Sequence, residues 1–220
     1  MRTPFERLAP GAVGVKICGI TNAADAGMAI EAGADALGFN FYADSKRFVA
    51  LETERHWLEK VPDSVLRVAV VVNPTRDEAM RLLEEPFLDA IQLHGDETVD
   101  FAKALSSASE KMVIKALRVQ NAESLRAVAD FEEFPVLLDA FAGNERGGTG
   151  HTFDWNWIQA APETERLLLS GGLTPENVAT ALRLTKLRYV DVASGVEENP
   201  RQKSAGEVRQ FVAEVRKSAS

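Results

Sequence analysis

Cys18 is the only cysteine of the 220-residue chain, and it lies near the end of the apolar run VGVKICGI at residues 13–20. A thiolate can act as a base or nucleophile, whereas a buried thiol most often only fills space. Lys16 stands two residues earlier, so in a strand both side chains point to the same face. An ammonium there would favour the thiolate, unless Asp191 on a neighbouring strand takes it as an ion-pair partner. The sequence leaves both roles of Lys16 open.

Asp139 occupies a similar position in the apolar run PVLLDA at residues 135–140. Desolvation at an apolar strand end favours the neutral carboxylic acid, which is the form that a general acid needs. The alternative is a helix cap, but no helical pattern begins before about Asp154. We therefore interpret Asp139 as a candidate general acid.

Three glycine-rich segments follow the last three apolar runs: GGTG at 147–150, SGGLTPEN at 170–177 and ASGVE at 193–197. Glycines let backbone N–H groups approach an anion, although they also serve tight turns. Adjacent loops of this kind predict a phosphate site. Its candidate residues are Gly171, Gly172, Ser194 and Gly195.

Arg47 lies in the segment FNFYADSKRF, where its planar fork is suited to an anionic group of a ligand. A lone loop arginine is more often solvated, so that reading stays open. A nucleophilic triad of Cys18, His94 and Asp139 is rejected, because the strands bearing Cys18 and His94 would be nearly opposite in a barrel, beyond the ~3 Å that such a triad needs. The three histidines show no ligand spacing, so we expect no metal site.

Eight short apolar runs alternate with amphipathic segments along the chain, which predicts a (β/α)₈ barrel. The rival, an open doubly wound sheet, usually has fewer strands, and CGITNAADAG lacks the glycine pattern of a dinucleotide site. A barrel would gather the polar strand ends at one mouth. The apolar runs span residues 13–20, 36–41, 66–72, 90–94, 112–117, 135–140, 166–171 and 189–194. The polar residues at the expected strand ends are Cys18, Asn40, Asn73, His94, Arg118, Asp139, Ser170 and Ser194. The expected helices start after Asn22, Thr53, Thr75 and Thr174.

The composition limits the classes of partner and the cellular compartment that we expect. With 25 basic and 33 acidic residues the net charge is -8, which disfavours nucleic acid and anionic membranes as partners. No apolar run approaches the ~20 residues of a membrane span, no signal peptide is evident, and a single cysteine fits a reducing compartment. We expect one cytoplasmic barrel domain over residues 1–220 with an extension at about 1–12, as a monomer or homodimer.

Seven motifs stand in order between residues 15 and 197: KICGIT, GFNFYADSKRF, QLHGDE, LLDA, GGTGHTFDW, LSGGLTPENV and VDVASGVE. Together they resemble the phosphoribosylanthranilate isomerase family of tryptophan biosynthesis. The resemblance implies an Amadori rearrangement of N-(5-phosphoribosyl)anthranilate to 1-(2-carboxyphenylamino)-1-deoxyribulose 5-phosphate, without a cofactor. It implies that Cys18 is the general base, Asp139 the general acid and Arg47 the partner of the anthranilate carboxylate, with His94 among the substrate-binding residues. Phe48 departs from the tyrosine common in the family.

Two alternatives remain at this point. One is another phosphosugar isomerase or lyase of the same fold, although no D-x-K-x-x-D pattern typical of related decarboxylases stands at a strand end. The other is a non-catalytic protein that binds a phosphorylated ligand. The presence of both Cys18 and Asp139 favours an enzyme.

Overall fold

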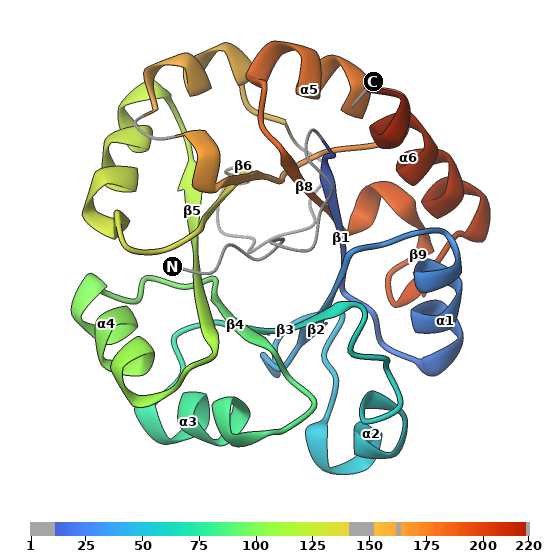
Figure 1. Cartoon of the computed structure of the whole chain (residues 1–220), viewed down its shortest axis with the longest axis vertical. Helices are drawn as coiled ribbons and strands as arrows, with labels where there is room; N and C mark the ends of the chain where they lie inside the picture. The colour runs from blue at the N-terminus through green and yellow to red at the C-terminus, as the bar shows by residue number, and fades with distance from the viewer. Residues whose placement is uncertain (1–11, 141–151, 162–163, 219–220) are drawn as a thin grey trace.

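A closed barrel of eight strands forms the centre of the computed structural model, which describes residues 12–140, 152–161 and 164–218. Each strand pairs in parallel with the next, and β8 returns to pair with β1. Helices surround the barrel on all sides (Figure 1). The predicted (β/α)₈ barrel is therefore confirmed. The GGTG segment at 147–150 and nearly all of the expected extension lie outside the described residues.

The elements follow the predicted alternation. The strands are β1 (Gly14–Cys18), β2 (Ala36–Asn40), β3 (Leu66–Val71), β4 (Ala90–Leu93), β5 (Met112–Val119), β6 (Val136–Ala140), β7 (Leu167–Leu169), β8 (Tyr189–Val192), β9 (Glu197–Asn199) and β10 (Gln202–Lys203). The α-helices are α1 (Ala23–Glu31), α2 (Leu51–Leu58), α3 (Arg76–Glu84), α4 (Val99–Ala108), α5 (Val178–Thr185) and α6 (Ala205–Ser218). The 3₁₀ helices are η1 (Ala122–Phe131), η2 (Trp155–Ala160), η3 (Thr164–Arg166) and η4 (Ser194–Val196).

The apolar residues divide into two cores because successive strand side chains point to opposite faces. A small cluster that includes Val68, Ile114 and Leu137 fills the barrel interior, and a larger one lies between the barrel and its helices. The alternation that turns Leu137 inward also turns Asp139 toward the interior, at the C-terminal mouth. The barrel thus positions polar strand ends around one opening.

Two helix starts agree with the sequence signals. The side chain of Asn22 accepts a hydrogen bond from Asp25 N at 2.8 Å and caps α1. Thr75 and Glu78 form a reciprocal capping box at the start of α3. Gly33, at φ +95°, follows the end of α1, where a left-handed residue is common.

Two other expected helix starts are wrong. Helix α2 begins at Leu51, and Thr53 is its third residue, with Oγ1 donating to the carbonyl of Ala50. Helix α5 begins at Val178 rather than directly after Thr174, because Asn177 first closes a turn by accepting from Thr174 N at 2.9 Å. At α5 this local hydrogen bond competes with the helix. At α2 the Thr53 hydroxyl bonds back to the first turn, so it does not cap the helix.

The described helices include none long and apolar enough to cross a bilayer.

Candidate active site

A cavity of about 560 Å³ opens at the C-terminal mouth of the barrel. Binding sites of this fold lie at that end. The cavity brings together all of the predicted site residues, from strand ends and from the loops that follow them. They are Cys18, Arg47, His94, Asp139, Gly171, Gly172, Ser194 and Gly195.

Cys18 lies next to a buried series of polar side chains inside the barrel, formed by Lys16, Asp191 and Ser170. Lys16 is fully buried, and its Nζ donates to Asp191 Oδ1 at 2.6 Å; Ser170 Oγ donates to Asp191 Oδ2 at 2.9 Å. Gly38 leaves room beside the thiol, since a Cβ there would lie 2.8 Å from Cys18 Sγ and 3.1 Å from Lys16 Nζ. Lys16 therefore pairs with Asp191 and also lies next to the thiol.

The charges around the thiol oppose one another. Burial raises the pKa of the Cys18 thiol above its ordinary value; Lys16 opposes this rise, and Asp191 adds to it. Burial alone would lower the pKa of Lys16, but Asp191 and Cys18 together hold it above the ordinary value. Lys16 thus pairs with Asp191 and also favours the thiolate, but it does not overcome the effect of burial on the Cys18 pKa in the free protein.

Asp139 is buried at the end of β6 and contacts His94. Nε2 of His94 lies 3.1 Å from Asp139 Oδ2, and Nδ1 of the same ring lies 2.9 Å from Nε2 of Gln92. The Gln92 amide, the His94 imidazole and the Asp139 carboxyl group therefore form one hydrogen-bonded series that runs from the barrel interior to the cavity. The rejected triad is only partly in contact, since the described contacts join His94 to Asp139 and not to Cys18.

Arg47 is held over the cavity by an ion pair that the sequence did not indicate. Its Nε and Nη2 donate to the two carboxylate oxygens of Glu197 at 2.7 and 2.6 Å, and Lys203 Nζ donates to Oε1 of Glu197 at 2.8 Å. Burial favours neutral Glu197, but hydrogen bonds and charge from Arg47 and Lys203 hold its pKa below the ordinary value. Only 12% of the Arg47 side chain is exposed, so the solvated-loop reading is wrong.

The glycines of the last two βα loops allow close backbone approach. Gly171 and Gly172 have φ of +85° and +63°, and a Cβ on Gly171 would lie 2.3 Å from Ala140 N. A Cβ on Gly195 would lie 1.8 Å from the carbonyl oxygen of Leu173, so the loops after β7 and β8 touch there. Larger residues would force these loops apart.

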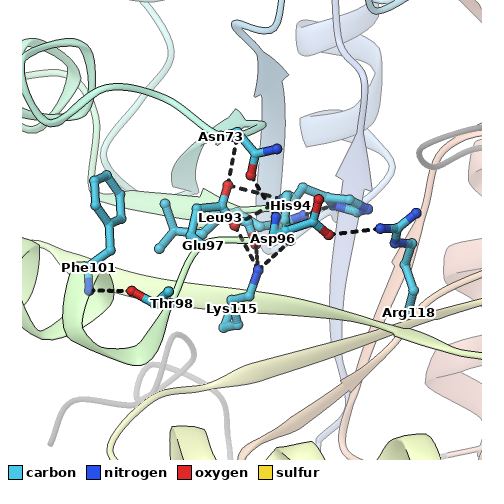
Figure 2. A network of polar contacts seen from close by, with 11 residues as sticks. Asn73, Leu93, His94, Asp96, Glu97, Thr98, Phe101, Lys115 and Arg118 are labelled. Atoms are coloured by element: carbon cyan, nitrogen blue, oxygen red, sulfur yellow. Dashed lines mark hydrogen bonds and ion pairs between the residues drawn. The ribbon is translucent and has the colours of Figure 1, made fainter.

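Two of the polar strand ends, Asn73 and Arg118, bond to Asp96 in the loop after β4 (Figure 2). Oδ1 of Asn73 accepts from Asp96 N at 2.7 Å, and Arg118 Nη2 donates to Asp96 Oδ1 at 2.9 Å. Neither Asn73 nor Arg118 is among the residues that line the cavity. Among the described residues, no group of three or more histidine, cysteine or acidic side chains is placed to hold a metal ion.

Comparison with known proteins agrees with this geometry. The family model for N-(5'-phosphoribosyl)anthranilate (PRA) isomerase matches residues 15–214. The chain belongs to the PRA isomerase family. A PRA isomerase of Citrifermentans bemidjiense is 43% identical over 205 residues, covering 93% of this chain and 98% of the relative.

Solved structures of PRA isomerases match the whole barrel. The crystal structure of the Thermotoga maritima protein has a TM-score of 0.84 at 39% identity and covers 92% of this chain and 98% of its own. A PRA isomerase in complex with reduced 1-(o-carboxyphenylamino)-1-deoxyribulose 5-phosphate has a TM-score of 0.80 at 36% identity, with the same coverage. The chain is thus an enzyme of tryptophan biosynthesis that isomerises N-(5'-phosphoribosyl)anthranilate.

Proposed function

We propose that Cys18 is the general base and Asp139 the general acid of this PRA isomerase. The observation that carries the proposal is their placement: the two side chains line one cavity from β1 and β6, on separate parts of its wall. The substrate has its ring oxygen and its C2′ hydrogen on different parts of one sugar. A split acid and base can therefore serve both atoms without moving the substrate.

The proposed reaction proceeds in two proton transfers. Asp139 gives its proton to the furanose ring oxygen, the C1′–O bond breaks with its electrons moving to that oxygen, and a protonated Schiff base forms. The Cys18 thiolate then removes the C2′ proton, and the C2′–H electrons neutralise the iminium to give an enolamine. Tautomerisation of the enolamine gives the ketone. Each transfer contributes about 10²- to 10⁴-fold in rate.

A direct assay tests the function. Purified protein and N-(5'-phosphoribosyl)anthranilate are mixed, and formation of the aminoketose is followed at several protein concentrations. We expect catalytic turnover of this substrate. Turnover of another phosphosugar alone would favour the other isomerase or lyase, and stoichiometric binding without turnover would indicate a binding protein.

The glycine loops after β7 and β8 are the proposed phosphate site. We expect Gly172→Val and Gly195→Val to raise KM about 10- to 100-fold, because valine strains the left-handed backbone at Gly172 and collides with Leu173 at Gly195, which displaces backbone N–H groups that bind the charged phosphate. Inorganic phosphate should inhibit the native enzyme competitively and inhibit both variants more weakly. Gly27→Ala is the control, since a Cβ at Gly27 meets no atom within 4 Å. Native KM and native phosphate inhibition in both variants would contradict the site.

Arg47 is the proposed partner of the anthranilate carboxylate. Glu197 uses its Nε and Nη2, which leaves Nη1 and the second hydrogen of Nη2 for another carboxylate. We expect Arg47→Lys, which keeps the charge and loses the fork, to raise KM about 10-fold or more. Steady-state kinetics check this, with exposed Arg126→Lys as the control. Native affinity for the substrate in Arg47→Lys, or in Arg47→Ala, would show that Arg47 does not bind the anthranilate carboxylate.

The remaining parts of the proposal concern the setting of the enzyme. We infer a single barrel domain that works in the cytoplasm without a cofactor, as a monomer or homodimer. The barrel spans the described chain from β1 to α6, and the acid–base scheme above needs no electron acceptor or metal. His94 lines the cavity beside Asp139, which agrees with contact to the sugar portion of the substrate.

A further inference from the structure

The placement of the Gln92 amide assigns a tautomer to His94. Nε2 of the Gln92 amide can only donate, so Nδ1 of His94, 2.9 Å away, accepts. The hydrogen of the neutral ring then lies on Nε2, which faces Asp139 Oδ2 at 3.1 Å. The ring therefore donates to Oδ2, and Oδ1 of Asp139 is left for another partner.

Packing does not explain a glutamine at position 92. The side chain is 0% exposed and points into the barrel interior. Within the described part of the chain its Oε1 is buried without a hydrogen-bond partner. An unpaired buried carbonyl costs about 1–3 kcal/mol, which methionine or leucine would avoid. The contact that distinguishes Gln92 from an apolar residue is its bond to the His94 ring.

The backbone on both sides of His94 is fixed by a buried ion pair (Figure 2). Lys115 Nζ donates to the carbonyls of Leu93 and Gly95 at 3.3 and 2.7 Å and to Glu97 Oε2 at 2.7 Å. Both oxygens of Glu97 accept in turn from Gly95 N at 3.0 Å. All three ammonium hydrogens have acceptors, so the segment that carries the ring is held in place.

We propose that His94 is a positioning residue for the general acid, with Gln92 setting its tautomer. The inference rests on the proposed role of Asp139. Its Oδ1 carries the proton that passes to the furanose ring oxygen, and Oδ2 accepts from His94 Nε2–H throughout. As the proton leaves, negative charge develops on the carboxylate, and the hydrogen bond to Oδ2 strengthens. No proton moves to or from the ring.

Substitutions at His94 separate this role from substrate binding. We expect His94→Leu, which removes the donor, to lower kcat about 10- to 100-fold, because a hydrogen bond to a developing charge is lost. His94→Gln places an amide N–H close to the position of Nε2 and should recover most of that loss. Because His94 also lines the cavity, the Kd of reduced 1-(o-carboxyphenylamino)-1-deoxyribulose 5-phosphate should change in both variants, but by far less than kcat does in His94→Leu. A higher Kd with native kcat in His94→Leu would overturn the proposal.

The tautomer is tested directly by long-range ¹H–¹⁵N spectra of protein labelled at histidine. The His94 signal is assigned by its loss in His94→Gln, and it should show the hydrogen on Nε2. Gln92→Met removes the amide donor, so the spectrum should shift toward a mixture of tautomers and kcat should fall with native KM. Hydrogen on Nδ1 in the native enzyme, or an unchanged spectrum in Gln92→Met, would contradict the assignment.

The outcomes also separate this inference from the proposed acid. Native kcat in Asp139→Asn would show that Asp139 is not the general acid, and it would therefore overturn this inference as well. Native kcat in His94→Leu, with Asp139→Asn inactive, would overturn the role of His94 alone. Thermal unfolding of each variant excludes loss of fold as the cause of a lower rate.

Discussion

Asp139→Asn is expected to lower kcat by about 10²- to 10⁴-fold, the range for loss of a general acid. The variant should still bind reduced 1-(o-carboxyphenylamino)-1-deoxyribulose 5-phosphate. Asparagine keeps the shape of the buried side chain, and its Oδ1 can accept from His94. Its amide cannot give a proton to the furanose ring oxygen. Single-turnover rates measure the change without interference from product release.

The control for this prediction is Asp130→Asn. The substitution is chemically identical and lies on the exposed end of η1, away from the cavity. It should leave the single-turnover rate and the melting temperature unchanged. A near-native rate in Asp139→Asn would place the general acid on another residue.

The candidate residues could be predicted from the sequence because a parallel barrel imposes their meeting point. Cys18 and Asp139 are 121 positions apart, yet each ends an apolar run, and the ends of parallel strands face the same mouth. Asn22 and Thr75 were also predictable, because capping depends on residues within the next turn.

The partners of these residues were not predictable in the same way. Glu197 pairs with Arg47 across 150 positions, and His94 reaches Asp139 across 45. Such pairs depend on loop paths and side-chain lengths, which strand periodicity does not specify. Glu197 carried a weak signal, since it is the acidic residue of the ASGVE segment. Gln92 carried a clearer one, as a polar residue at an inward position of a buried strand.

The helical layer after β5 and β6 differs from the regular α-helical pattern of the other units. Helix η1 is a 3₁₀ helix whose start is fixed by Asn121 and Ser124, and Asp154 caps the short η2. Asn22 and Thr75 cap the α-helices α1 and α3 in the same way, so these caps determine where η1 and η2 begin and not how tightly they wind. The sequence indicated helical positions there but not the tighter winding.

Cys18→Ala and Cys18→Ser are expected to lower the single-turnover rate about 10²- to 10⁴-fold, as for loss of a general base. Alanine removes the base, and the serine hydroxyl has a far higher pKa than a thiol. Both residues fit in the space of the thiol beside Gly38, so the barrel should remain folded. Near-native rates in Cys18→Ala would show that the cysteine only fills space.

The pH dependence of kcat/KM identifies the thiolate. Burial raises the pKa of Cys18, so the thiolate forms only at alkaline pH, while Asp139 must keep the proton that it donates. The product of these two fractions makes kcat/KM bell-shaped in pH, with an alkaline limb above pH ~8.5, the ordinary pKa of a thiol. Cys18→Asp should recover part of the activity and move this alkaline limb to lower pH, because a carboxylate with an ordinary pKa of ~3.9 replaces the thiol. Lys203, which lies near the thiol and whose pKa is lowered by burial, is a second group that titrates at alkaline pH, and the pKa of buried Lys115 is lowered in the same way. An alkaline limb that keeps its position in Cys18→Asp would assign that limb to a group other than Cys18 and contradict the thiolate base.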